Sequence, residues 1–62
     1  MQTRWVHTAA EHLDQGRVEE ALRLSLEGTR VHPWYATGHL VLGRCFERLK
    51  RLPESLVAYR TA

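Results

Sequence analysis

A similarity between the two halves of this sequence most constrains what the chain can fold into. Sliding the sequence along itself until Arg17 meets Arg51 also aligns Glu20 with Glu54 and Leu22 with Leu56. We call this displacement the repeat offset. It also pairs Ala9 with Gly43, so a small residue recurs where two helices would need to approach closely. A period of about 20 to 50 residues is typical of proteins that stack copies of one supersecondary unit. The sequence therefore predicts one unit used twice.

Glycine and proline divide the chain into four segments, each with apolar residues at helical spacing. The predicted segments are about 3–15 ending at Gly16, about 18–31 closed by Pro33, a third from Trp34 or Tyr35, and a fourth from Pro53 to Ala62. No segment reads as a strand. Because short connections cannot cross a domain, neighbouring helices must pack antiparallel. We expect an all-α fold of four helices.

The size and composition of the chain exclude several classes. A chain of 62 residues buries only about 60% of the surface that its unfolded state exposes, so its core is marginal. Its one cysteine, Cys45, cannot form an intrachain disulfide, and this favours a reducing, cytoplasmic location. No apolar run approaches the length of about 20 residues that spans a bilayer. We therefore expect a protein that makes no membrane contact.

Further residues of the two halves follow a known pattern. In residues 2–35 the matching positions are Trp5, Ala9, Gly16, Ala21 and Pro33, and in residues 36–62 they are Leu42, Gly43, Phe46, Tyr59 and Ala62. In this pattern the chain resembles the tetratricopeptide repeat family, whose unit is a helix-turn-helix of about 34 residues. His39, Lys50 and Ser55 depart from the family's usual aromatic, glycine and alanine. For Lys50 at the glycine position, a left-handed conformation would cost about 1 kcal/mol.

The resemblance implies an α-solenoid of about four helices, with residues 2–35 as a first repeat and residues 36–62 as an incomplete second one. It also implies a non-catalytic protein-interaction module, or scaffold, in which the first helix of each repeat lines a concave face. The partner-binding residues expected by position are Thr3, Val6, Ala10 and Asp14 of the first helix, and Thr37, Leu40, Val41, Arg44 and Arg48 of the third.

The chemistry of these positions predicts the kind of partner. Arg44 and Arg48 are one helical turn apart, so they share a helical face and would together hold a carboxylate or phosphate. Some members of the family grip a C-terminal carboxylate with lysine and asparagine, but Val6, Ala10 and Val41 stand at those positions here. The expected partner is therefore an acidic, amphipathic protein segment, with Leu40 and Val41 giving apolar contact.

Catalytic and metal-binding alternatives have little support in the residue pattern. Cys45 lies among apolar residues of a predicted helix and reads as a small packed side chain. The spacing of His7 and His12 does not place them on one helical face. The chain is also too short to enclose a pocket of about 300 Å³ or more and still keep a core. We expect no enzymatic activity, no metal and no other cofactor.

Other functions stay open at this point. The net charge is −1 over residues 1–31 and +3 over residues 32–62, and the basic cluster Arg44, Arg48, Lys50 and Arg51 allows weak binding of nucleic acid. A bridging fragment of a larger enzyme or secretion protein is another alternative.

The last predicted helix lacks the polar outer face of a terminal repeat. Leu56 and Tyr59 on that helix therefore predict self-association, or a longer array.

Overall fold

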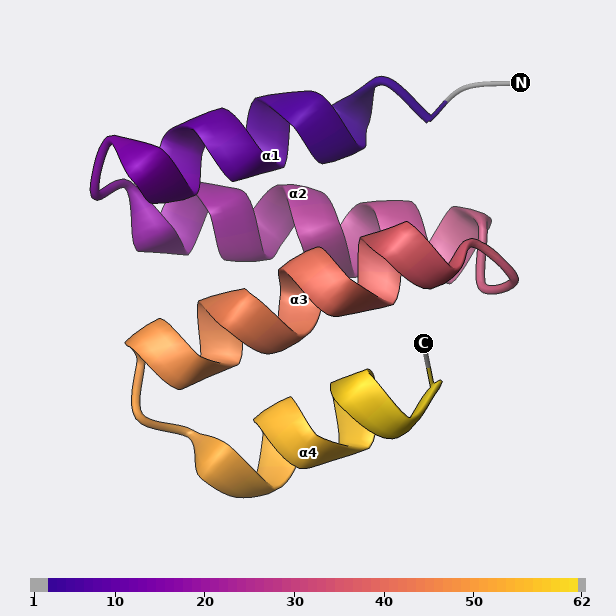
Figure 1. Ribbon diagram of the computed structural model, residues 1–62. Coiled ribbons are helices and arrows are strands. Elements are labelled where there is room, and N and C mark those ends of the chain that lie inside the picture. Colours follow the sequence, from indigo (N-terminus) through magenta and orange to yellow (C-terminus); the bar gives the residue numbers. More distant parts are fainter. Residues whose placement is uncertain (1–2, 62) are drawn as a thin grey trace.

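The computed structural model describes residues 3–61, and this part of the chain consists of four α-helices. They are α1 (Trp5–Asp14), α2 (Val18–Val31), α3 (Ala36–Arg48) and α4 (Leu52–Thr61) (Figure 1). The prediction of an all-α fold is confirmed, and no strand occurs within the described residues. The helix boundaries differ slightly from expectation, since α1 begins at Trp5 instead of about residue 3 and α4 begins at Leu52 instead of Pro53. The expected helical end at Ala62 lies outside the described residues.

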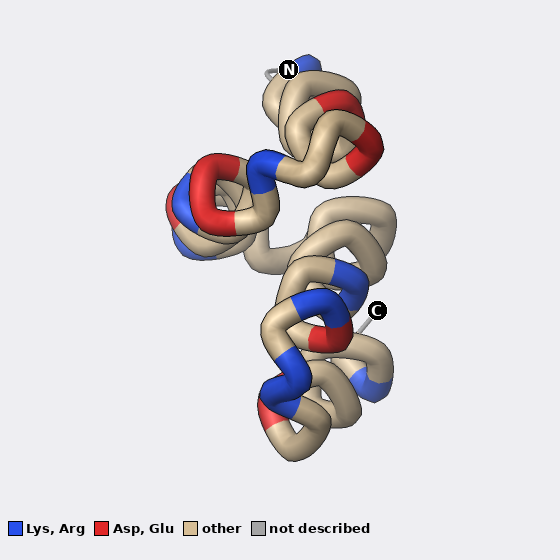
Figure 2. The backbone as a smooth tube through the Cα atoms, turned by 90° about the vertical axis from the view of Figure 1, so that its left-hand side faces the viewer, with Lys and Arg blue, Asp and Glu red and all other residues tan. Residues whose placement is uncertain are grey.

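The helices form two antiparallel hairpins, α1–α2 and α3–α4, that pack on each other through α2 and α3 (Figure 1). α1 also contacts α3. Seen along the helices, α2 lies to one side while α1 and α3 lie on the other (Figure 2). The described chain measures 31 × 25 × 13 Å, so it is a thin slab with α1 and α4 at opposite edges.

The turns inside the two hairpins are equivalent. Gly16 and Lys50, which the repeat offset pairs, are both left-handed, with φ angles of 81° and 60°. After each of them the next backbone N–H reaches back to the preceding helix, from Arg17 to the His12 carbonyl at 2.7 Å and from Arg51 to the Phe46 carbonyl at 2.8 Å. This is the Schellman motif, which satisfies the last carbonyls of a helix. Lys50 thus adopts the left-handed conformation in spite of its side chain.

Small residues let aromatic rings pack directly on helix backbone. The indole of Trp5 lies against Gly28 of α2 and Gly38 of α3, where a Cβ on Gly38 would come within 2.5 Å of the ring. The ring of Tyr59 on α4 lies against Gly43 of α3 in the same manner. Glycine is needed at these positions because any larger side chain would occupy the space of the ring. These contacts fix how closely the helices approach.

The core lies between the hairpins and continues into the second one. Its first cluster consists of the buried residues Val6, Ala9, Leu13, Ala21, Val41 and Cys45. A second cluster of Leu42, Phe46 and Ala58 joins α3 to α4, and the half-buried Leu22 of α2 packs against both clusters. Hydrophobic burial along the α2–α3 contact therefore holds the two hairpins together.

Candidate functional site

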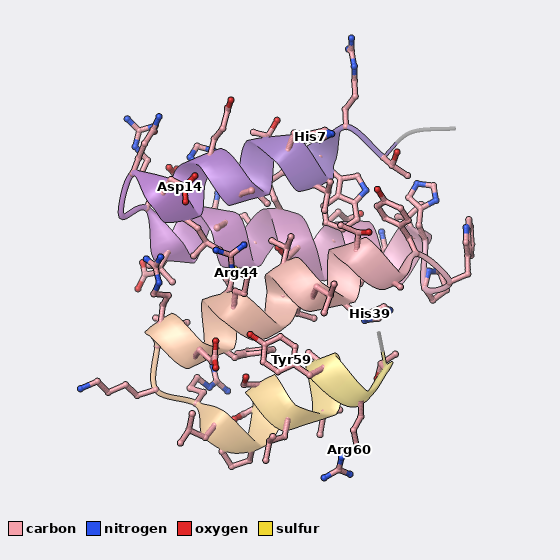
Figure 3. The ribbon with its side chains drawn as sticks, in the orientation of Figure 1. His7, Asp14, His39, Arg44, Tyr59 and Arg60 are labelled. Atoms are coloured by element: carbon pink, nitrogen blue, oxygen red, sulfur yellow. The ribbon has the colours of Figure 1, made fainter. Side chains whose placement is uncertain are left out.

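The face shared by α1 and α3 carries most of the residues predicted to bind a partner. We define the α1–α3 face as Thr3, Ala10, Asp14, Thr37, Leu40 and Arg44, all of which are exposed or half-buried. Figure 3 shows Asp14 near the end of α1 and Arg44 extending from α3 away from α4. The α1–α3 contact places the two helices side by side. The face thus combines apolar side chains, two hydroxyls, a carboxylate and a guanidinium.

Two residues predicted for this face lie in the core instead. Val6 is 4% exposed and Val41 is 6% exposed, and both belong to the cluster that joins α1, α2 and α3. They are buried because α1 and α3 meet along the helical stripe that contains them. The prediction that Val6 and Val41 offer contact surface is therefore wrong, and Leu40, at 45% exposed, is the large apolar residue of the face.

The two arginines predicted to act together have different roles in the structure. Arg48 donates a hydrogen bond from Nη1 to the carbonyl oxygen of Leu13, at 3.3 Å, and so binds the C-terminal end of α1. A cation at this end also interacts favourably with the helix dipole. Arg44 is exposed and takes no part in the ion pairs of the described chain, which are Glu27–Arg30 and Arg51–Glu54. Both arginines are exposed, but only Arg48 makes a hydrogen bond to α1.

Contacts within the chain also divide the basic cluster that suggested nucleic-acid binding. Arg51 pairs with Glu54 at 2.9 Å, and its guanidinium lies 5.4 Å from the centre of the Phe46 ring. Arg48 is held by α1. Basic residues still dominate the α3–α4 part of the molecule, whereas acidic ones gather on α1 and α2 (Figure 2). Two of the four basic residues in the cluster thus make contacts within the chain.

Tyr59, predicted to mediate self-association, faces into its own hairpin (Figure 3). Its hydroxyl donates a hydrogen bond to Oε1 of Glu47 at 2.8 Å, and its ring covers Gly43. Burial, together with the hydrogen bond to Glu47 and the charge of that carboxylate, raises the pKa of the Tyr59 hydroxyl. Leu56 is exposed, as the prediction needs, so only one of the two residues points outward.

Sequence reasoning missed two exposed apolar residues of α4. Leu52 is 59% exposed and Val57 is 60% exposed. The repeat offset contains a signal for Leu52, because it aligns this residue with another apolar residue, Val18. Val57 aligns with the exposed Arg23, so no equivalent signal exists for it.

An open groove of about 530 Å³ lies between α3 and α4. It is lined by His39, Leu42, Phe46, Pro53, Glu54, Val57, Ala58 and Thr61. The matching place in the first hairpin, beside Trp5, is a hollow of about 180 Å³. The imidazole of His39 stands where the repeat offset puts the larger indole, and its Nε2 lies 2.8 Å from the Pro33 carbonyl oxygen. This groove is open to solvent, whereas the expectation from chain length concerned an enclosed pocket.

The remaining nucleophilic and metal-binding candidates are dispersed or buried. Cys45 is fully buried, with Sγ 3.9 Å from the hydroxyl oxygen of Ser25. Burial raises the pKa of this thiol, which keeps it protonated near neutral pH. No group of three or more His, Cys, Asp or Glu side chains within residues 3–61 is arranged to hold a metal ion. This arrangement fits the interpretation of Cys45 as a packed core residue.

None of the helices within the described residues has the length and apolar character needed to cross a membrane. No protein-family model, curated protein or solved structure matches the chain. A function for this protein therefore has to be argued from its own geometry.

Proposed function

We propose that this chain is a non-catalytic protein-interaction module, built as two tetratricopeptide-like repeats stacked as a short α-solenoid. The observation that carries the proposal is the equivalence of the two hairpin turns, with left-handed Gly16 and Lys50 and matching hydrogen bonds at positions that the repeat offset pairs. Repeated helical hairpins present an extended surface made of the same helix from each unit. In this chain those helices are α1 and α3.

The partner binds on the α1–α3 face as an amphipathic segment with at least one acidic group. Leu40 supplies the apolar contact, and Thr37 lies one turn before it on the exposed side of α3. Arg44 supplies the charge that selects a carboxylate. Arg48 supports this face indirectly, because its hydrogen bond to Leu13 ties the end of α1 to α3. We place the module in the cytoplasm, where a reducing environment keeps the single thiol of Cys45 free.

The test is affinity capture followed by direct binding measurements on the captured partner. Arg44→Glu is the informative variant, since its side chain is exposed and makes no ion pair within the described chain. Arg23→Glu is the matched control, because Arg23 is equally an exposed helical arginine but lies on α2. We expect Arg44→Glu to weaken binding by about tenfold or more, and Arg23→Glu to leave it within about twofold. Equal affinities for the two variants would contradict the proposal.

A further inference from the structure

Three exposed leucines lie at the edge of the slab formed by the second hairpin. They are Leu40 of α3 and Leu52 and Leu56 of α4, which are 45%, 59% and 56% exposed. We call the surface formed by these leucines and Tyr59 the end face. Tyr59 forms its floor, since the ring lies against Gly43 of α3. Leu40 belongs to both the end face and the α1–α3 face, whereas the other three residues lie on α4.

The first hairpin shows what covers such a surface. The repeat offset maps the three leucines onto Val6, Val18 and Leu22. Val6 is 4% exposed, and Val18 and Leu22 are half-buried against the core. The helix that covers them is α3, whose buried Val41 and Cys45 share their cluster. The end face is therefore a second copy of a surface that accepts a helix, and it has no helix on it within the described chain.

We propose that the end face binds one amphipathic helix of another protein, which lies on α4 as α3 lies on α2. This second interaction surface is centred on α4, and it shares only Leu40 with the α1–α3 face. It rests on the equivalence of the hairpins and does not depend on which partner the α1–α3 face takes.

The floor of the end face defines the shape of the bound helix. In the first hairpin the position of Tyr59 is occupied by Ser25, a small side chain with Cys45 of α3 beside it at 3.9 Å. The ring of Tyr59 takes up more of this space than a serine does. The bound helix must therefore have glycine or alanine opposite Tyr59, with larger apolar residues one turn away on each side for the leucines.

The charges beside the end face define the flanks of the bound helix. Arg60 is exposed on α4, one turn after Leu56, and joins no ion pair among residues 3–61. Its charge favours a carboxylate on the partner. A second copy of this chain fits less well, because pairing two end faces would bring the two copies of this arginine together. The outward side of α1 does not fit either, since it exposes Thr8, Glu11 and Gln15.

A synthetic peptide that copies the helix covering the first hairpin tests the proposal. The probe has the sequence of residues 36–49 with Cys45→Ala, which makes room for Tyr59, and Arg44→Glu, which supplies the carboxylate. Its fluorescence anisotropy is measured against the full chain and against two variants. Leu56→Asp puts a charge on the end face, and Leu26→Asp is the matched control, because Leu26 is 47% exposed on α2. Circular dichroism checks that each variant keeps its helicity.

We expect saturable binding to the unaltered chain, a loss of at least about tenfold for Leu56→Asp, and a change within about twofold for Leu26→Asp. Should Leu56→Asp unfold, Leu52→Asp replaces it, since an aspartate at the N-terminal end of α4 favours that helix. Amide shifts on adding the peptide should centre on Leu52, Leu56 and Tyr59. Absence of binding at millimolar peptide, or equal binding by both variants, would overturn the proposal. So would a dimer of the free chain in sedimentation that Leu56→Asp disperses, because the occupant would then be a second copy.

Discussion

Replacing Lys50 with glycine should stabilise the protein. Lys50 has a φ angle of 60°, in the region where a side chain crowds the backbone. This conformation costs a non-glycine residue about 1 to 2 kcal/mol. Glycine removes that cost but brings a more flexible unfolded state, which offsets about 0.5 to 1 kcal/mol. We expect Lys50→Gly to raise the free energy of unfolding by about 0.5 to 1 kcal/mol.

The reciprocal change at the equivalent turn provides a second measurement. Gly16 has a φ angle of 81°, and a Cβ added there would meet no atom within 4 Å. Gly16→Ala therefore measures the conformational cost without a steric clash, and it should lower stability by about 1 kcal/mol. Lys50→Ala is the control for loss of the lysine side chain, and it should change stability by less than about 0.5 kcal/mol.

Urea unfolding followed by circular dichroism gives all three values. The midpoint should shift while the slope with denaturant stays constant, since the surface exposed on unfolding does not change. The reasoning fails if Lys50→Gly leaves the midpoint unchanged or lowers it. It also fails if Lys50→Ala stabilises as much as glycine does, because the left-handed backbone would then not be the cause.

Three further outcomes follow from the packing of the second hairpin. Gly43→Ala should destabilise the protein by about 1 to 2 kcal/mol, because the added Cβ would lie 2.6 Å from the Tyr59 ring. In a Tyr59→Ala background the same change should stabilise the protein by about 1 kcal/mol. Urea midpoints of the unaltered chain, the two single variants and the double variant measure this coupling, and equal effects of Gly43→Ala in both backgrounds would contradict it. The raised pKa of Tyr59 means that folding opposes ionisation of its hydroxyl, so its contribution to the free energy of unfolding is complete below pH about 10 and is lost as the pH rises through the folded pKa. Tyr59→Phe should therefore remove this part of the loss of stability at high pH. Identical profiles of stability against pH for the two proteins, from about pH 9 to 11.5, would refute this prediction. His39→Trp should fill the groove of about 530 Å³ with an indole, as Trp5 does in the first hairpin, and raise the melting temperature; a lower one would show that the ring does not fit.

Residues that act through backbone conformation were predictable from the sequence. Gly16 and Pro33 mark where helices end, and the repeat offset places Lys50 at a glycine position, which its φ angle confirms. Ala9 and Gly43 are assigned to close helix contacts by their size alone. The inferences about the turns succeed because each depends on one residue and its local neighbours.

Residues whose role depends on the meeting of two helices were not predictable. Periodicity places Val6 and Val41 on a face of α1 and of α3, but it does not say how far the α1–α3 contact extends across that face. The helical spacing of Arg44 and Arg48 also gives no information about the carbonyl oxygen of Leu13. This oxygen is distant in sequence and, of the two arginines, accepts a hydrogen bond only from Arg48. Tyr59 turns inward because Gly43 leaves room for its ring, and this is a pairing across helices.

The most direct test of the account is the affinity of a captured partner for three forms of the full chain. We expect Arg44→Glu to weaken the complex by about tenfold or more, while Arg23→Glu binds like the unaltered chain and both keep their helicity. If both variants bind the partner as tightly as the unaltered chain, the α1–α3 face is not the interaction surface and the proposed function is wrong.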